Sequence, residues 1–274
     1  MELRHIIAVG KPRASVLLLH GYGEHTGRHS AFIEVLAAGG YDVFFYDQPS
    51  HGTADGPAAC VDVAELINVH LMARMQVRAR MRTESLILFG HSMGGLITAA
   101  SALIRPDDIS AVVLSGPAFR QYPELPPLVS EIGYKLAGIM PCLPVARLDS
   151  SLISRDPAAV ERYERDPLVY HGRVPLLTGA SMAVQGRRTL DNARRWRTDL
   201  PLFIVHGSAD GLANIDGSQE FAAAVRLAGA PVDFVDVAGG YHEVFNDIGR
   251  EKLEEQLLWW LDQQNLSQAT RALS

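Results

Sequence analysis

The stretch LFGHSMGGL (residues 88–96) carries the pattern best suited to covalent catalysis. It fits G-x-S-x-G, with Ser92 between Gly90 and Gly94. An apolar run precedes the serine and a helix-compatible run follows it, so we predict a sharp strand-to-helix turn that exposes the hydroxyl. The N–H of Met93 would open that helix and point to where an oxyanion can form. A Gly-rich surface turn would explain the glycines but not the flanking strand and helix, so we interpret Ser92 as a nucleophile.

A serine nucleophile needs a base, and two later loops supply a histidine and an acid. His242 lies in VAGGYHEVFND, after the last apolar run, and Asp210 lies in LFIVHGSADG, after the run before it. The order Ser, Asp, His is the one expected when the nucleophile stands on such a turn. Asp210 would orient the His242 ring and stabilise its imidazolium. Asp210 could instead be an ordinary turn residue before Gly, and Asp216 is interpreted as the N-cap of the next helix.

The early loop in VLLLHGYGEHTGRH (residues 16–29) follows an apolar run and is the expected place for a second oxyanion donor. We assign that role to the N–H of Tyr22, paired with Met93. A metal site is the alternative, but the histidines His20, His25 and His29 have no recognised ligand spacing, so we predict no metal. A phosphate-binding loop would need G-K-[ST] or G-x-G-x-x-G, and neither is present.

Short apolar runs alternate with helical patterns along the chain. The runs expected to be strands are residues 15–20, 41–47, 85–90, 111–116, 202–207 and 232–239. The expected helices are residues 30–38, 61–81, 93–104, 217–227 and 249–262. Continuous apolar strands indicate a sheet buried on both faces, and the alternation predicts a doubly wound, mostly parallel α/β sheet.

Residues 117–198 interrupt this alternation. They contain several prolines and no convincing strand, and residues 128–140 read as an amphipathic helix with few charges. We therefore expect a helical cap insertion over the carboxyl edge of the sheet, between core segments 1–116 and 199–274. The helix could contact a lipid surface or cover a pocket, and the second is more usual for an apolar stripe.

The bulk properties of the chain exclude several classes of protein. Its 274 residues carry 25 basic and 31 acidic side chains, a net charge of −6, which argues against nucleic-acid binding. Cys60 and Cys142 share no ligand spacing and are not expected to form a disulfide framework. No signal-peptide pattern opens the chain and no window reaches the roughly 18 to 20 apolar residues of a membrane span. We expect a soluble cytoplasmic protein, with peripheral membrane association only through the cap.

Several motifs together resemble one family. HGYGEHTGRH, GHSMGG, the cap segment SRDPAAVERYERDPLVYHGRV, HGSADGL and YHEVFND are similar to those of bacterial monoacylglycerol lipases, which are serine-aminopeptidase-like α/β-hydrolases. The resemblance runs from about residue 15 to the C-terminus. It implies an α/β-hydrolase fold with a helical cap, an acyl pocket and a polar corner for glycerol. By matching positions, Glu24, Arg28 and Tyr163 belong to that corner. Glu24 and Arg28 could equally be a structural ion pair.

Two positions depart from the family pattern. The family commonly has D-x-R-G-H-G-x-S after the second strand, where this chain has DQPSHGTAD with Pro49 and Ser50. Mammalian monoacylglycerol lipases place a second histidine three residues after the catalytic one, and here that position is Phe245.

The sequence and the resemblance together predict a serine hydrolase without cofactor. Its expected substrate is a monoacylglycerol or similar lipid ester, cleaved to glycerol and fatty acid through an acyl-enzyme. A carboxylesterase, lysophospholipase or peptidase on the same scaffold is an alternative, although Glu24 alone does not establish the anchor that a peptidase needs for a substrate amine. A lipid receptor with a dormant triad is the alternative outside the enzymes.

Overall fold

A seven-stranded, mostly parallel sheet forms the centre of the computed structural model, which describes residues 2–264. Its strand order is β1-β3-β2-β4-β5-β8-β9, and only β1 runs antiparallel to its neighbour. The strands are β1 (Arg4–Ile6), β2 (Ala14–Leu19), β3 (Tyr41–Phe45), β4 (Leu86–His91), β5 (Ala111–Ser115), β8 (Leu202–Gly207) and β9 (Val232–Val237). Residues 1 and 265–274, part of the predicted core, lie outside the described residues.

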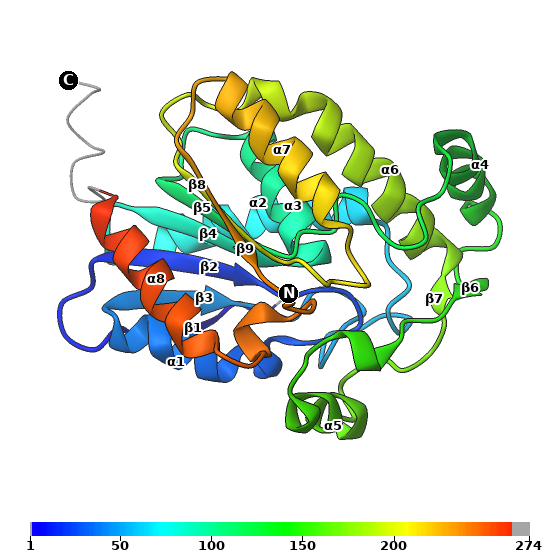
Figure 1. The fold of residues 1–274 in the computed structure, drawn as a ribbon, viewed down its shortest axis with the longest axis horizontal. Helices are drawn as coiled ribbons and strands as arrows, with labels where there is room; N and C mark the ends of the chain where they lie inside the picture. Colours follow the sequence, from blue (N-terminus) through cyan, green and yellow to red (C-terminus); the bar gives the residue numbers. More distant parts are fainter. Residues whose placement is uncertain (1, 265–274) are drawn as a thin grey trace.

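Helices flank both faces of the sheet (Figure 1). They are α1 (Ser30–Ala38), α2 (Val63–Arg80), α3 (Met93–Ile104), α4 (Pro127–Ala137), α5 (Pro157–Arg165), α6 (Leu176–Asn192), α7 (Ile215–Leu227) and α8 (Arg250–Gln263). Short 3-10 turns are η1 (Thr26–His29), η2 (Ser150–Leu152), η3 (Ala193–Arg195) and η4 (Val244–Asn246).

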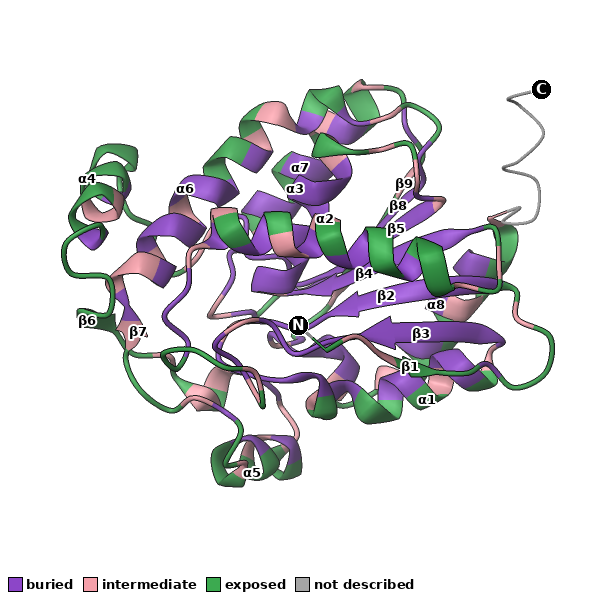
Figure 2. Cartoon of the chain, turned by 180° about the vertical axis from the view of Figure 1, so that it is seen from behind, coloured by how far each residue is buried: buried purple, intermediate pink, exposed green. Residues whose placement is uncertain are grey.

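The alternation of side chains along each strand divides the core into two layers. Leu17 and Leu19 of β2 face the layer that contains α2, α3 and α7, whereas Val16 and Leu18 face the layer with α1 and α8. Both sets are almost fully buried, which explains why the strands are continuously apolar rather than alternating (Figure 2). The doubly wound α/β architecture predicted from the sequence is confirmed. β1 was not predicted, because it is short and largely exposed at the edge of the sheet.

Residues 117–198 are called the insertion below. Their first part lies beyond the carboxyl ends of the strands, and α6 then runs back over α2 and α3 toward the start of β8 (Figure 2). The insertion contains α4, α5 and α6 and, contrary to expectation, two short antiparallel strands, β6 (Pro144–Ala146) and β7 (Val174–Pro175). Prolines within these strands disguise them in the sequence. α6 contacts α4 on one side and α2 and α3 on the other, so it connects the insertion to the core.

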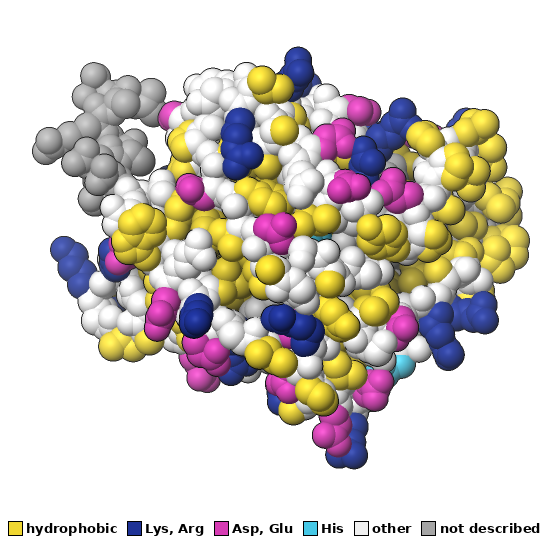
Figure 3. All heavy atoms as spheres, in the orientation of Figure 1, with side chains coloured by type: hydrophobic (Ala, Val, Ile, Leu, Met, Phe, Trp, Pro, Cys, Tyr) yellow, Lys and Arg dark blue, Asp and Glu magenta, His cyan; other side chains and the backbone are white. Residues whose placement is uncertain are grey.

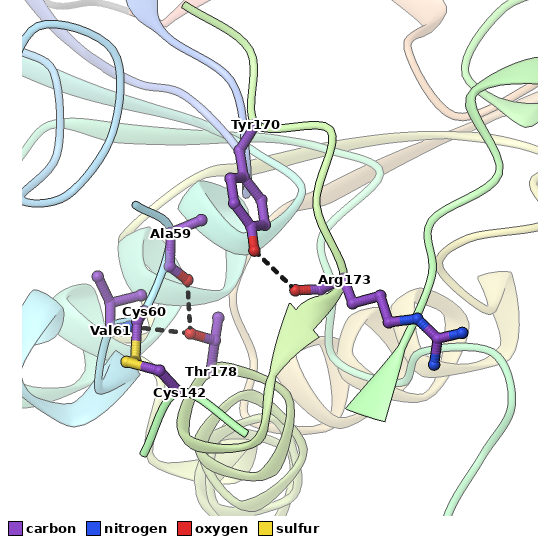
Figure 4. The surroundings of a disulfide bond; sticks show 7 residues. All are labelled: Ala59, Cys60, Val61, Cys142, Tyr170, Arg173 and Thr178. Atoms are coloured by element: carbon purple, nitrogen blue, oxygen red, sulfur yellow. Dashed lines mark hydrogen bonds between the residues drawn. A yellow bond between two sulfur atoms is a disulfide. The ribbon is translucent and has the colours of Figure 1, made fainter. Parts of the chain in front are cut away.

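The two cysteines form a disulfide, which the sequence did not lead us to expect (Figure 4). Cys60, in the loop before α2, is buried, and Cys142, between α4 and β6, is exposed. The expectation was wrong because a sequence separation of 82 residues says nothing about proximity in space, and the fold brings the two Cα atoms to 5.7 Å. Beside the bond, the Thr178 hydroxyl donates to the Ala59 carbonyl and accepts from the Val61 N–H, so the disulfide lies at a hydrogen-bonded junction of insertion and core.

Candidate active site

Ser92 stands at the turn between β4 and α3, in a backbone conformation that few residues adopt. Its φ is +54° and its ψ is −121°. The turn depends on the flanking glycines. A Cβ on Gly90 would lie 2.4 Å from the Gly94 carbonyl oxygen, and one on Gly94 would lie 2.3 Å from the His20 carbonyl oxygen. Strained residues of this kind concentrate at functional sites, and here the strain presents the Ser92 hydroxyl to a cavity.

The three predicted triad residues come together above the carboxyl ends of β4, β8 and β9. Nε2 of His242 lies 2.8 Å from the Ser92 Oγ, and Nδ1 of His242 lies 2.6 Å from Oδ2 of Asp210. With Nδ1–H donating to the carboxylate, Nε2 is free to accept the serine proton. The second oxygen of Asp210 accepts the N–H groups of Leu212 and Ala213, which fixes the carboxylate in place.

Asp216, the other acidic residue after β8, plays no part in this contact and does not cap α7. The cap is Asn214, whose side chain accepts the N–H of Asp216. The predicted N-cap was therefore wrong by two residues. Asp216 is exposed in the first turn of α7, where the helix dipole favours a negative charge.

Asp210 has a second imidazole neighbour that sequence reasoning did not assign to the site. Nε2 of His206 lies 3.0 Å from Oδ2 of Asp210, and Nδ1 of His206 lies 2.8 Å from the Ser218 hydroxyl. His206 is the fifth residue of β8 and is fully buried. Its place at the end of the strand that delivers Asp210 was the only signal in the sequence.

The pKa values of His242 and Asp210 move apart. Burial opposes the charged form of His242, but the Asp210 carboxylate, its hydrogen bond and the more distant Glu243 and Glu24 outweigh burial and raise the pKa of His242 above 6.5. Burial likewise opposes ionisation of Asp210, yet His242 and His206 hold its pKa well below the usual range. An ionised acid beside a more basic imidazole is the state required for His242 to take the proton of Ser92.

Both residues predicted to supply an oxyanion donor lie near the nucleophile. Met93 is the first residue of α3, where N–H groups have no partner within the helix. Tyr22 lines the same cavity as Ser92, in the loop after β2. The Cβ that Gly21 lacks would lie 3.0 Å from the Ser92 Cβ, so this loop passes directly over the nucleophile.

The loop that contains Pro49 and Ser50 supports the oxyanion side despite its departure from the family pattern. The Gln48 N–H donates to Nε2 of His20 at 2.9 Å, and the Gln48 amide donates to the His20 carbonyl at 2.7 Å. Asp47 accepts the N–H of Thr26 at 3.0 Å, so the loop after β3 pins the loop after β2 at two points. Neither Asp47 nor Gln48 was singled out in the sequence, although both belong to the quoted DQPSHGTAD.

Glu24 and Arg28 belong to a buried polar cluster beside the nucleophile. Arg28 donates from Nε to Glu24 at 3.3 Å and from Nη2 to Glu243 at 2.5 Å, while its guanidinium lies 4.6 Å from the centre of the Tyr163 ring. Glu24 also accepts the Gly21 N–H and contacts His29, whose Nε2 is 3.1 Å away. Glu24, Tyr163 and Glu243 line the cavity. We call Glu24, Arg28, Tyr163 and Glu243 the polar corner.

The cavity above Ser92 has a volume of about 460 Å³ and lies between the sheet edge and the insertion. Its wall is mainly apolar away from the polar corner. Side chains of α4 and α6 contribute Val129, Leu176, Ala180, Met182 and Ala183. A mostly apolar cleft with a few polar groups at one end suits an amphiphilic small molecule.

No cluster of three or more His, Cys, Asp or Glu side chains within residues 2–264 is arranged to hold a metal ion. The three histidines of the early loop have separate partners. His20 contacts Gln48, His25 contacts Asp166 at 2.8 Å, and His29 contacts Glu24.

Comparison with known proteins places this chain in a family. The family described as Serine aminopeptidase, S33, matches residues 10–249. A monoacylglycerol lipase of Mycolicibacterium smegmatis is 33% identical over 252 residues, which are 91% of this chain and 88% of that protein. The crystal structure of a Paleococcus ferrophilus monoacylglycerol lipase superimposes with a TM-score of 0.83 at 32% identity, covering 95% of this chain and 98% of that one.

A more distant structure has the same fold. A soluble variant of the Saccharomyces cerevisiae monoglyceride lipase, in complex with a substrate analog, gives a TM-score of 0.81 at 22% identity and covers 96% of this chain and 91% of that one. Fold, nucleophile turn and family match agree, and the chain belongs to the serine aminopeptidase S33 family of α/β-hydrolases.

Proposed function

We propose that this protein is a serine hydrolase that cleaves monoacylglycerols to glycerol and a free fatty acid. The single observation that carries the chemistry is His242, hydrogen-bonded to the Ser92 hydroxyl on one side and to Asp210 on the other. The substrate class is supported by the monoacylglycerol lipases among its relatives and by the apolar cavity with its polar corner.

The reaction proceeds through an acyl-enzyme. Ser92 attacks the ester carbonyl while His242 accepts its proton, and the Tyr22 and Met93 N–H groups bind the oxyanion. The C–O bond to glycerol then breaks as His242 protonates the leaving oxygen. A water molecule, deprotonated by the same imidazole, attacks the acyl-enzyme and releases the fatty acid. Asp210 keeps the ring oriented in both halves of the reaction.

The acyl chain lies along the apolar wall, and the glycerol lies toward Glu24, Arg28 and Tyr163. The Tyr163 hydroxyl makes no hydrogen bond within the described residues and can bond the leaving alcohol. Because Arg28 bonds two carboxylates, it also holds the corner together, so the structural and the binding interpretations of the Glu24–Arg28 pair are compatible.

The decisive experiment is hydrolysis of monoacylglycerols of several chain lengths beside di- and triacylglycerols and lysophospholipids. We expect the highest kcat/KM for monoacylglycerols and a loss of about 10⁶-fold in kcat for Ser92→Ala, with unchanged circular dichroism. Preference for a lysophospholipid or a simple alkyl ester would favour the alternative enzymes. Failure of a fluorophosphonate probe to label Ser92 would favour a dormant receptor.

We also propose that the insertion acts as a cap and that α4 contacts lipid surfaces. Only Ser130 and Ala137 of α4 are buried. Leu128, Ile132 and Leu136 are exposed, and Ile139 just beyond the helix is 82% exposed. Hydrophobic side chains gather over α4 and β6 at the right-hand edge of Figure 3. A patch of this kind beside a cavity for lipid esters favours interfacial binding.

Co-sedimentation with phosphatidylcholine vesicles tests the lipid contact. We expect the wild type to bind and Ile132→Glu to lose binding while it keeps its activity on a soluble short ester. Leu227→Glu, at another apolar residue that is 72% exposed but lies on α7, is the matched control and should bind like the wild type. Equal binding by all three proteins, or by none, would remove α4 as a lipid contact.

No helix within residues 2–264 is long and apolar enough to cross a membrane. The cytoplasmic location stays a prediction. A permanent Cys60–Cys142 disulfide would argue against it, because stable disulfides are rare in that compartment. Thiol trapping during rapid cell lysis, followed by fractionation, measures both the location and the oxidation state of the pair.

A further inference from the structure

Glu243 is a buried carboxylate beside the catalytic histidine. It has no role in the reaction proposed above. It follows His242 directly, lines the cavity and is 5% exposed. Its backbone N–H donates to the Ile153 carbonyl at 2.7 Å, so the segment around η2 holds it in place. Oε2 accepts hydrogen bonds from Arg28 and from the Asn246 amide. Oε1 accepts none from any described residue.

Phe245, three residues after His242, does not reach the cavity. Its ring packs with Phe32 and Phe89, at centroid distances of 4.4 and 5.7 Å, and is 5% exposed. Phe245 therefore belongs to the apolar layer under the sheet and is absent from the cavity wall. The only charged side chain that the loop after β9 brings to the cavity is that of Glu243.

The polar corner carries an excess of negative charge. Glu24 and Glu243 face one guanidinium, that of Arg28, which bridges them and does not itself line the cavity. The neighbouring His91 is neutral because burial and the nearby His242 lower its pKa to about 3. His29 contacts Glu24 but not Glu243. The Tyr163 hydroxyl stays protonated, since burial and the two carboxylates raise its pKa.

The side chains of Glu243 and Tyr163 thus offer an unpartnered anionic acceptor and an unpartnered hydroxyl at one end of a catalytic cavity. Both residues are more than nine-tenths buried. Because Glu243 lines the cavity and its Oε1 has no partner among the described residues, a ligand group in the cavity can donate a hydrogen bond to this oxygen. A cationic donor gains more than a neutral one in such a site, whereas an anionic group is repelled.

We propose that Glu243 determines the leaving-group specificity of this enzyme, so that it hydrolyses fatty acyl esters of amino alcohols as well as of glycerol and rejects esters whose alcohol carries an anion. This inference rests on the proposed ester hydrolysis. The reaction is the same: the acyl C–O bond breaks, Ser92 takes the acyl group, and His242 gives the proton to the amino alcohol oxygen. Water then supplies the hydroxyl of the fatty acid, and the ammonium group is unchanged.

Four lauroyl esters with leaving alcohols of equal non-hydrogen atom count form the test series. The alcohols are glycerol, dimethylaminoethanol, isoamyl alcohol and hydroxypropanoate. The second, third and fourth differ essentially in charge, being cationic, neutral and anionic at neutral pH. The dimethylamino group also prevents acyl migration from oxygen to nitrogen. We expect kcat/KM to be about tenfold higher for the cationic than for the neutral ester, and lowest for the anionic one.

The variant Glu243→Gln keeps the shape of the side chain and an oxygen for Arg28 while it removes the charge. We expect the cationic-to-neutral ratio of kcat/KM to fall several-fold toward one. Any effect of the variant on His242 cancels in this ratio, because both esters use the same imidazole. Glu251→Gln, on the exposed side of α8, is the matched control and should keep the wild-type ratio.

The outcomes separate this inference from the proposed function. A wild-type ratio near one, a ratio unchanged in Glu243→Gln, or no turnover of the dimethylaminoethyl and isoamyl esters while lauroylglycerol is cleaved would each overturn the role of Glu243. Failure to cleave lauroylglycerol would instead overturn the proposed substrate. The wild-type series decides the charge preference even if the variant does not fold.

Discussion

The catalytic centre and α4 differ in how they are held. At the centre, buried charged groups bond one another and the backbone: Asp210 accepts from two backbone N–H groups and His242. α4 presents mainly apolar side chains to the outside. The Tyr134 hydroxyl, which donates to Asp62 at 2.6 Å, and the disulfide after the helix attach it to the loop before α2. In Figure 2 the strands of the sheet are purple, whereas α4, at the edge of the molecule, is largely green.

The two regions meet different requirements, one for the reaction and one for entry of the substrate. Acyl transfer requires groups positioned to within a fraction of an ångström, and a fully hydrogen-bonded network built on strand ends provides that. Entry of a lipid requires a wall that can adapt, and we propose that α4, with few buried side chains, provides it. Changes at the centre should therefore alter rates far more than stability, and changes at the attachment of α4 should do the reverse.

After the loss of the nucleophile itself, the largest effect should follow from Asp210→Asn. The amide would favour the wrong tautomer of His242, so kcat should fall by about 10⁴-fold with little change in KM. Steady-state hydrolysis of a soluble p-nitrophenyl ester measures this. Asp216→Asn, at the exposed acid of the first turn of α7, should stay within a few-fold of the wild type. Equal losses in the two variants would show that Asp210 has no special role.

Much of the fold and of the centre could be predicted from the sequence. Ser92, Asp210 and His242 each follow a recognisable apolar strand, and parallel strands deliver their carboxyl ends to one edge. Chain order alone therefore anticipates the contacts that the structure contains. Glu243 was missed because a residue next to a histidine has no pattern of its own. Its place in the polar corner depends on its contact with Arg28, which is distant in sequence.

The insertion was harder to predict, for physical reasons. Gly179 and Gly186 lower the intrinsic helix propensity of α6, so the helix was not recognised. A Cβ on Gly186 would lie 2.2 Å from the Phe119 carbonyl oxygen, so close packing requires this glycine. The disulfide was equally invisible, since its two cysteines belong to different units of the chain and become neighbours only in the folded protein.

The next effect should come from removing the disulfide with the double substitution Cys60→Ser and Cys142→Ser. Opening a crosslink between residues 82 apart should lower the free energy of unfolding by about 2–4 kcal/mol, because the unfolded chain gains freedom. Urea unfolding of the variant and of the wild type measures this. Activity on a soluble short ester at 25 °C should stay within a few-fold. A parallel loss of short-ester activity would contradict the separation of α4 from the centre.

A smaller effect is expected on the pH dependence of kcat/KM. Neutral His242 is the active base, so kcat/KM should rise with pH through an inflection above 6.5, the ordinary pKa of histidine. Glu243 favours the imidazolium, so Glu243→Gln should lower the pKa of His242 and move the inflection to lower pH. Rates with an uncharged short ester across the pH range measure both. An inflection that does not move would show that the Glu243 charge is not felt at His242.

The smallest effect should come from Tyr134→Phe, which removes the α4 hydrogen bond to Asp62 but keeps the ring. The pair is partly exposed, so we expect a loss of about 0.5–1 kcal/mol in the free energy of unfolding. α4 depends on few polar contacts. We therefore expect protease to cleave this variant within residues 117–198 before it cleaves the core. Limited proteolysis with identification of the first cleavage site measures this. First cleavage in the core instead would mean that α4 is held as firmly as the catalytic centre, and the contrast between the two regions would fail.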